Sequence, residues 1–276
     1  MEQLRVDVGG RDLAVTIDGQ GKNTIVFLHG LTGHQHNFYH LVQQLKSDFK
    51  TVTVDLAGRG ESDPSEKSSL LQHARDVKVL LEKLAIEEPI LIGHSMGAFI
   101  TSIIASEHQH VKGVVYLDGA CKVDPVLSAV LQPSLSRLQK TYETKKQYLQ
   151  EMQQLYAMLG ITWTEEIEKA VLYEVVETDG IWRSKMNVRN INEDLQGFAD
   201  YNPKAIAEKV ECPVLLVTAT GNIGPLPALF APHFFEDTKN YTKNIETLVT
   251  PSNHYTMVGV HQPDMNRAIY DFVKLL

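Results

Sequence analysis

The feature that most constrains the fold of this 276-residue chain is an alternation of short apolar runs with helix-like patterns. The runs are rich in β-branched residues and occupy residues 24–30, 51–58, 89–95, 113–119, 213–219 and 245–250. Runs this short and this apolar are typical of strands buried on both faces of a parallel sheet. Helix-like patterns at 70–86, at 96–108 and at the C-terminal end separate several of them. The alternation predicts an α/β fold with a doubly wound, mostly parallel sheet, preceded by a β-hairpin around Gly9-Gly10.

One segment, residues 124–209, interrupts this alternation with helix-like patterns and no convincing strand. It predicts a helical cap inserted into the core, which then comprises residues 1–123 and 210–276. Within the cap, apolar and aromatic side chains share one face of a predicted helix. Packing of the cap on the core is the favoured interpretation of this face. Because a cap can also contact a substrate, we predict Tyr148, Met152 and Tyr156 as candidate substrate-binding residues.

The strongest chemical signal is Gly93-His94-Ser95-Met96-Gly97, which follows a strand-like run and opens a helix-like one. This is the context of the G-x-S-x-G nucleophile elbow, in which a sharp strand-to-helix turn exposes a serine above the sheet. Small residues are needed on both sides because larger side chains would clash at the turn. The pattern predicts that Ser95 is a nucleophile.

A second turn, FLHGLTG at residues 27–33, ends another predicted strand. The backbone N–H groups of Leu31 and Met96 are placed to form an oxyanion hole, two donors that stabilise a developing negative oxygen. His29 belongs to the same turn. We expect it to shape the loop, and we also predict it as a candidate substrate-binding residue.

The segments FLHGLTG, DLAGRGESD (55–63), GHSMGAF (93–99) and SNHYTMV (252–258) occur in the order that is typical of the α/β-hydrolase superfamily. The chain resembles a capped esterase or lactonase of that superfamily over nearly its whole length. The resemblance implies an eight-stranded, mostly parallel sheet flanked by helices. It also implies a catalytic triad in the chain order serine, acid, histidine.

By this resemblance, His254 in the late loop is the catalytic base. The acid is less obvious, because the usual loop after the run at 213–219 reads TGNIGPLP and contains no carboxylate. Asp118 ends the preceding run, and some members of the superfamily carry their acid there. We predict Asp118 as the acid, with a simple turn-capping role as its alternative and with Glu236 and Asp237 as reserve candidates.

The histidines of GHQHNFYH suggest a metal site at first sight. His36 and His40 would share a helical face, but His34 would not, and no nearby carboxylate or cysteine completes a site. Histidines at the rim of a pocket are the better interpretation, so we predict no metal and no cofactor. In DLAGRGESD, Arg59 is expected to pair with Asp55 or Asp63.

Composition excludes several classes of partner. The formal charge is −8, and no Lys/Arg cluster offers a face for nucleic acid. Cys121 and Cys212 are too few and too far apart for a disulfide framework. No signal peptide or run of about 20 apolar residues is visible, which predicts a soluble, cytoplasmic protein without a membrane partner. A homodimer is compatible with the sequence.

Together these features predict a serine hydrolase that cleaves a small-molecule carboxylic ester, or a lactone, through an acyl-enzyme. An amide or carbon–carbon bond hydrolase would use the same triad and stays open. So does a hydrolase-fold signalling protein that binds a ligand with little turnover, because fold does not determine function.

Overall fold

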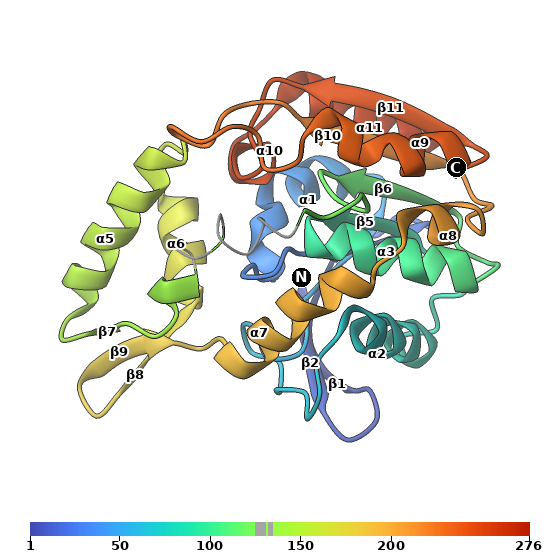
Figure 1. Ribbon diagram of the computed structural model, residues 1–276. Helices are drawn as coiled ribbons and strands as arrows, with labels where there is room; N and C mark the ends of the chain where they lie inside the picture. The colour runs from blue at the N-terminus through green and yellow to red at the C-terminus, as the bar shows by residue number, and fades with distance from the viewer. Residues whose placement is uncertain (125–130, 132–134) are drawn as a thin grey trace.

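The computed structural model describes residues 1–124, 131 and 135–276. Its centre is an eight-stranded sheet in the order β1-β2-β4-β3-β5-β6-β10-β11 (Figure 1). The first two strands form an antiparallel hairpin that also pairs antiparallel with β4, and all later pairings are parallel. The prediction of a mostly parallel sheet is therefore confirmed. The strand bounds are β1 Glu2–Asp7, β2 Asp12–Asp18, β3 Thr24–Leu28, β4 Lys50–Val54, β5 Ile90–His94, β6 Gly113–Leu117, β10 Val214–Ala219 and β11 Ile245–Thr250.

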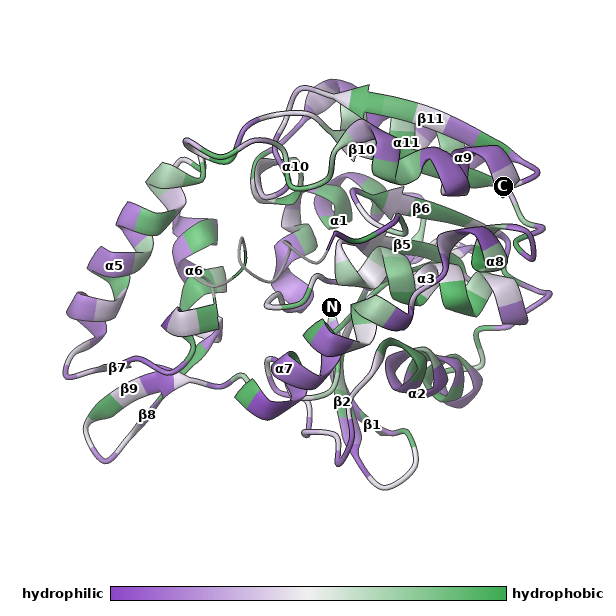
Figure 2. Ribbon diagram, viewed as in Figure 1, coloured by the Kyte–Doolittle hydropathy of each residue, from purple (hydrophilic) through white to green (hydrophobic). Residues whose placement is uncertain are grey.

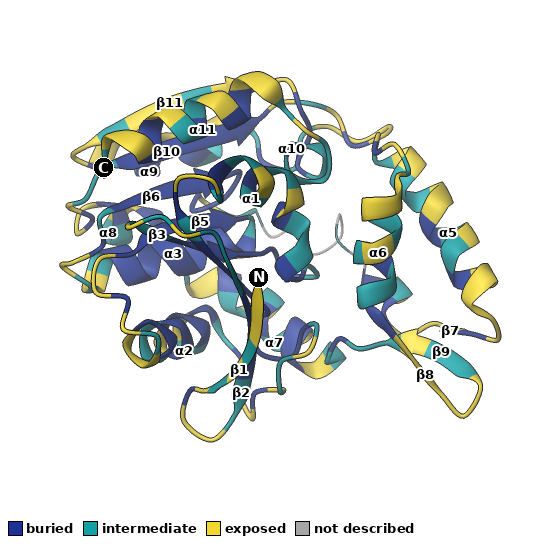
Figure 3. Cartoon of the chain, turned by 180° about the vertical axis from the view of Figure 1, so that it is seen from behind, coloured by how far each residue is buried: buried dark blue, intermediate teal, exposed yellow. Residues whose placement is uncertain are grey.

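The central strands are buried along their whole length, which explains why their sequences are continuous apolar runs. Every residue of β5, β6 and β10 is buried, whereas the residues of the edge strands β1 and β11 are mostly exposed or partly buried (Figure 3). A strand covered by helices on both faces has no polar side. The core thus lies on both sides of the sheet.

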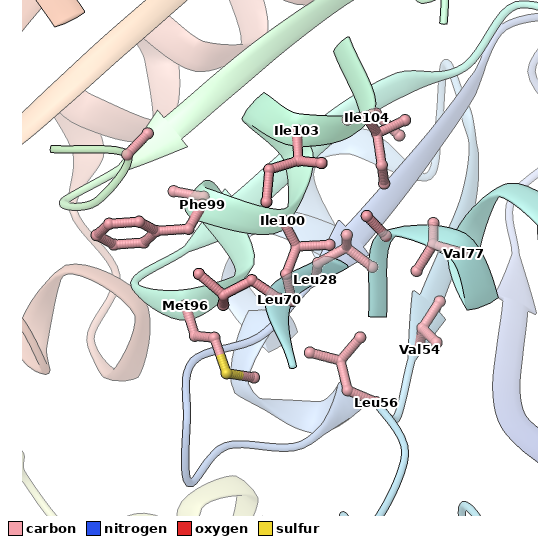
Figure 4. Packing of buried hydrophobic residues seen from close by; sticks show 14 of the residues in the cluster. Leu28, Val54, Leu56, Leu70, Val77, Met96, Phe99, Ile100, Ile103 and Ile104 are labelled. Carbon is pink, nitrogen blue, oxygen red and sulfur yellow. The ribbon is translucent and has the colours of Figure 1, made fainter. Parts of the chain in front are cut away.

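One face of the sheet is covered by α2 (Leu70–Lys83), α3 (Met96–Glu107), α8 (Pro203–Ala207) and α9 (Glu236–Tyr241). Figure 4 shows side chains of α2 and α3 gathered with those of β3 and β4 in one apolar cluster. The other face is covered by α1 (Tyr39–Leu45), α10 (Thr256–Gly259) and α11 (Pro263–Leu275). In α11 the apolar residues Met265, Ile269, Phe272 and Val273 are buried in the core on this face, and Figure 2 shows both hydrophobic and hydrophilic residues along the helix.

Between β6 and β10, the chain builds a segment that stands away from the sheet (Figure 1). It contains α5 (Lys145–Met158), α6 (Glu165–Tyr173) and three short strands, β7 (Thr141–Tyr142), β8 (Val175–Thr178) and β9 (Ile181–Ser184). The chain then returns through α7 (Val188–Gly197) to α8, which packs on α3 and α9 of the core. Residues 125–130 and 132–134, near the start of the predicted insertion and including Pro125 and Pro133, lie outside the described residues.

The prediction of a purely helical insertion was wrong, because β7, β9 and β8 form a small antiparallel sheet. Its hairpin turns at Asp179-Gly180, whose φ angles of 55° and 76° are both positive. Two positive φ angles in succession are the requirement of a type I′ turn, for which Asp-Gly is a preferred pair. The β-branched and aromatic residues on both sides of this pair are the signal that could have predicted the hairpin.

Two buried polar contacts tie this segment and its return helix to the core. The Tyr173 hydroxyl donates to Asp55 Oδ2 at 2.5 Å. Arg59 Nη2 lies 2.7 Å from Asp194 Oδ2 of α7, and both side chains are 0% exposed. The predicted pairing of Arg59 with Asp55 or Asp63 was therefore wrong, since α7, distant in sequence, supplies its partner. Among the described residues, no helix is long and apolar enough to cross a membrane.

Candidate active site

Ser95 lies at a tight turn between the end of β5 and the start of α3, with φ 52° and ψ −120°. A β-carbon added at Gly93 would lie 2.2 Å from the Gly97 carbonyl oxygen, and one added at Gly97 would lie 1.8 Å from the Leu28 carbonyl oxygen. Such distances leave no room for any side chain. The two glycines are therefore required by the turn, as the sequence pattern predicts.

Asp118 and His254 form a buried hydrogen-bonded pair. The distance from His254 Nδ1 to Asp118 Oδ2 is 2.7 Å, and the two side chains are 4% and 0% exposed. Asp118 directly follows β6 and has a φ of 47°. Its second oxygen, Oδ1, accepts a hydrogen bond from the Ala219 N–H at 3.1 Å. The last residue of β10, directly before the loop without a carboxylate, thus contributes a backbone donor that fixes the relocated acid.

The other acid candidates lie elsewhere. Glu236 and Asp237 begin α9, and neither lines the cavity that contains Ser95 and His254. Asn222, a polar residue without a carboxylate in the loop after β10, is exposed, and its backbone oxygen accepts a hydrogen bond from Asn253 Nδ2 at 3.2 Å. Of the carboxylates considered from the sequence, Asp118 is the one that pairs with His254.

His94 is a further residue of the site, and the sequence analysis assigned it no role. Its Nε2 lies 2.9 Å from the backbone oxygen of His254, and the two rings are 4.6 Å apart between centroids. A carbonyl oxygen only accepts, so Nε2 carries the proton and donates. Burial, and next the nearby His254 ring, hold the pKa of His94 well below its usual range. A neutral His94 therefore supports the loop that carries His254.

Ser95 and His254 open into one cavity between the core and the inserted segment, with a volume of about 150 Å³. Its wall is mostly apolar. Aliphatic and aromatic side chains come from both parts of the chain, including Leu31, Leu135, Leu155, Leu159, Ile161, Ile167, Phe198, Leu229, Phe230 and Val258. A concave, mainly apolar pocket with a few convergent polar groups is the usual form of a small-molecule site.

Of the two predicted oxyanion donors, one belongs to a residue that lines this cavity and the other to the residue that follows Ser95. Leu31 lines the cavity, and Met96 is the first residue of α3, where a backbone N–H has no partner within its own helix. Gly30 lies against the nucleophile, since a β-carbon there would be 3.1 Å from Ser95 Cβ. The turn and the elbow are therefore close enough to act on one carbonyl group.

His29 does not border the substrate site, and its predicted contact with substrate was wrong. It is 0% exposed and does not line the cavity. Its Nε2 accepts a hydrogen bond from the Leu56 N–H at 3.0 Å, so its Nδ1 carries the proton and donates to the Gly30 oxygen at 2.7 Å. Burial, chiefly, holds the pKa of His29 well below its usual range. His29 is a neutral residue that shapes the loop.

Of the three substrate contacts predicted in the cap, one lies where expected. Tyr156 lines the cavity. Tyr148 and Met152 do not, because they are buried in a separate apolar cluster of the inserted segment. The Tyr148 hydroxyl donates to the Val171 oxygen at 3.0 Å. The shared helical face thus packs against the second helix of the insertion, and the substrate prediction for these two residues was wrong.

Polar groups that sequence reasoning missed also face the cavity. Arg137 and Glu174 both line it and are joined at 2.9 Å between Nη1 and Oε2. Neither follows a recognisable motif, so no local signal identifies them. His36 and His40 line the cavity as predicted for rim histidines, whereas His34 is fully buried. No group of three or more potential metal ligands occurs within the described part of the chain.

Comparison with known proteins agrees with this architecture. Residues 23–223 match the family model described as the alpha/beta hydrolase fold. The chain belongs to the α/β-hydrolase family. A solved structure, E-2-(acetamidomethylene)succinate hydrolase, superposes with a TM-score of 0.84 at 23% identity, covering 99% of each chain.

Curated relatives match the chain over shorter stretches. A 2-(acetamidomethylene)succinate hydrolase of Mesorhizobium japonicum is 35% identical over 116 residues, 41% of this chain and 41% of the relative. A karrikin insensitive 2 receptor of Petunia hybrida is 38% identical over 97 residues, 33% of this chain and 36% of the receptor. The chain thus spans less than half the length of these two relatives, which include both a hydrolase and a receptor.

Proposed function

We propose that this α/β-hydrolase cleaves a carboxylic ester, or a lactone, through an acyl-enzyme on Ser95. The observation that carries the proposal is that His254, which lines the same cavity as Ser95, pairs through Nδ1 with the buried Asp118 Oδ2 at 2.7 Å. A nucleophile, a base and an orienting carboxylate are the three parts that serine hydrolysis needs.

In the proposed first step, Ser95 Oγ attacks the ester carbonyl carbon while His254 Nε2 takes the Oγ proton. Asp118 accepts from Nδ1, which fixes the tautomer and stabilises the imidazolium that forms. The N–H groups of Leu31 and Met96 donate to the carbonyl oxygen as it becomes negative. The tetrahedral intermediate then collapses, and His254 returns the proton to the departing alcohol.

In the second step, His254 takes a proton from water, and the resulting hydroxide attacks the acyl carbon. Collapse of this intermediate releases the acid and restores the Ser95 hydroxyl. Nothing in this sequence of steps needs a redox change. The apolar wall, with Leu155, Ile161 and Phe230 among its residues, favours a substrate that has a hydrocarbon or aromatic portion.

Hydrolysis of 4-nitrophenyl acetate, butyrate and hexanoate by the purified protein tests this proposal. We expect turnover by the wild type and its loss by at least three orders of magnitude in Ser95→Ala. Ser102→Ala is a matched control: Ser102 lies on α3 with its hydroxyl donating to the Phe99 oxygen, and it does not line the cavity. Circular dichroism checks that each variant folds. A folded wild type without turnover on any of these esters would refute the esterase proposal.

A second candidate function is hydrolysis of an amide. It is favoured by the relative from Mesorhizobium japonicum, whose name describes a hydrolase of an acetamido compound. The same triad would serve, with an amine as the leaving group. Parallel assays of 4-nitrophenyl butyrate and 4-nitrobutyranilide separate the two, since an esterase is expected to cleave the ester faster by far.

The similarity to a karrikin insensitive 2 receptor raises a third candidate, a ligand-binding protein with little turnover. Rate distinguishes it from an enzyme. Ester turnover of about one per second or faster supports an enzyme. Tight ligand binding, with a turnover that is orders of magnitude slower than this, supports a receptor.

A further inference from the structure

One wall of the mainly apolar cavity carries an ion pair. Arg137 and Glu174 both line the cavity, and their side chains are only 13% and 6% exposed. Leu135 and Leu155 are among the cavity residues that share this space with them. The triad does not involve the pair, because the mechanism uses Ser95, Asp118 and His254. The pair therefore needs its own explanation.

Both members of this pair stay charged. Burial by itself would raise the pKa of Glu174, but Arg137 and His34 outweigh burial and lower it. Burial would likewise lower the pKa of Arg137, and Glu174 more than offsets it. Removing two charges from water is costly, and an apolar pair of similar size is often as stable. Packing alone is therefore a weak reason for an ion pair in this wall.

Spare hydrogen-bonding capacity lies on the arginine side of the pair. Glu174 Oε2 accepts from Arg137 Nη1 at 2.9 Å, and its Oε1 lies 3.4 Å from His34 Nε2. A guanidinium has five N–H donors. The described residues supply hydrogen-bond partners to Nη1, whereas the enclosed Nε has none among them. Arg137 therefore has more donors than this pair uses, whereas each oxygen of Glu174 lies near a donor.

The charge balance decides which kind of acceptor fits. The charges of Arg137 and Glu174 cancel, and Glu166 adds a carboxylate at the exposed edge of the cavity. Burial, chiefly, lowers the pKa of the rim residue His36 to about 4, so this imidazole is neutral near pH 7. A carboxylate on the substrate would thus add an uncompensated negative charge to a poorly solvated space. A neutral oxygen accepts the hydrogen bond without that cost.

We propose that Arg137 is a specificity residue that donates a hydrogen bond to a second, neutral oxygen of the substrate. This oxygen is a keto or amide oxygen separated by several carbons from the carbonyl that Ser95 attacks. The inference rests on the proposed function for the position of the scissile carbonyl. It adds a substrate class: apolar esters with one remote neutral acceptor.

Binding to Ser95→Ala tests the inference separately from turnover. Calorimetry would compare methyl hexanoate and methyl octanoate with keto esters of the same lengths, the keto oxygen being three to seven carbons from the ester carbonyl. A second series places the keto group in the alcohol part. Half-esters of dicarboxylic acids of matched length test whether the cavity binds a ligand with a carboxylate at that position. A hydrogen bond from a charged donor predicts that the best keto ester binds about tenfold to a hundredfold more tightly than its hydrocarbon counterpart.

Arg137→Met in the same background is expected to abolish this preference. Arg137→Lys keeps the charge opposite Glu174 but loses the planar set of donors, and it should lose most of the preference. Lys140→Met is the control, since Lys140 is 52% exposed, pairs with Glu151 and does not line the cavity. It should leave the ratio of affinities unchanged.

Equal affinity for keto and hydrocarbon esters, at every length, would overturn the inference. So would a keto preference that survives in a folded Arg137→Met protein. Tighter binding of the half-esters would show that the cavity recognises an anion and would overturn the argument from charge. The proposed function fails by a different result, the absence of ester turnover in the wild type, which these binding ratios do not measure.

Discussion

Replacing Asp118 by asparagine is the perturbation whose effect follows most directly from the structure. Asp118 Oδ1 accepts from the Ala219 N–H at 3.1 Å, and Oδ2 pairs with His254 Nδ1 at 2.7 Å. In Asp118→Asn, the amide oxygen is expected to keep the bond to Ala219, because that N–H needs an acceptor. The amide NH₂ then faces His254 Nδ1. His254 must accept there, which moves its proton to Nε2, the nitrogen that should take the serine proton.

The loss can be estimated from the charge that the carboxylate supplies. An imidazolium and a carboxylate roughly 4 Å apart attract by about 4 kcal/mol at an effective dielectric constant near 20. Since about 1.4 kcal/mol corresponds to a tenfold change in rate, kcat should fall by about a thousandfold. The wrong tautomer adds to this loss. KM should change little, because Asp118 acts through His254 and does not touch the substrate.

Steady-state hydrolysis of 4-nitrophenyl butyrate measures this effect. Glu236→Gln and Asp237→Asn are the matched controls and should keep near-normal kcat, since neither residue lines the cavity. The reasoning would be refuted by a folded Asp118→Asn protein with nearly normal kcat while Ser95→Ala is inactive. In that case one of the two control positions should carry the acid.

Three further predictions concern stability. Tyr173→Phe removes the 2.5 Å bond to the buried Asp55 carboxylate and should lower the free energy of unfolding by about 1.5–3 kcal/mol, measured in urea. Asp194→Ala leaves Arg59 buried and unpaired, so it should cost about 3–5 kcal/mol in the same assay. Acid should lower the Tm between pH 6.5 and 4, because burial lowers the pKa of His36 to about 4 while the unfolded chain binds this proton near pH 6.5. His36→Phe should weaken that dependence.

The structure also provides a control for the stability measurements. Lys169→Ala breaks an exposed ion pair with Glu165 and should change the free energy of unfolding by less than about 1 kcal/mol. An equal effect of Asp194→Ala and Lys169→Ala would contradict the view that the buried pair matters. If Tyr173→Phe had the same free energy of unfolding in urea as the wild type, the predicted contribution of the contact with Asp55 would be wrong. A constant Tm from pH 7 to pH 4 would contradict the pH argument.

The catalytic candidates at the sheet edge could be predicted from the sequence because the carboxyl ends of parallel strands lie at the same edge of a sheet. Ser95 and Asp118 each follow such a strand, so their proximity follows from strand order once β5 and β6 are recognised as neighbours. The relocation of the acid could be inferred because the loop after β10 contains no carboxylate. The glycines of the elbow were predicted correctly because the turn has a strict geometric requirement that only glycine meets.

The inserted segment was harder to predict because an amphipathic face does not reveal what it packs against. Tyr148 and Met152 share a face with Tyr156, yet only Tyr156 lines the cavity. Arg137 and Glu174 are 37 positions apart and meet through the tertiary fold. The hairpin at Asp179-Gly180 was missed for another reason: its strands are only four residues long, and the segment was expected to be helical throughout. Contacts between residues that are far apart in the sequence cannot be recognised from local sequence patterns.

The central claim is that Ser95 is a nucleophile activated within this cavity. Its most direct test is the intact mass of the protein after reaction with a fluorophosphonate, which labels activated serine hydroxyls. The account predicts one adduct in the wild type, located by peptide mapping at Ser95, and none in a folded Ser95→Ala variant under the same conditions. An unlabelled wild type, or an equal adduct on the Ser95→Ala variant, would contradict it.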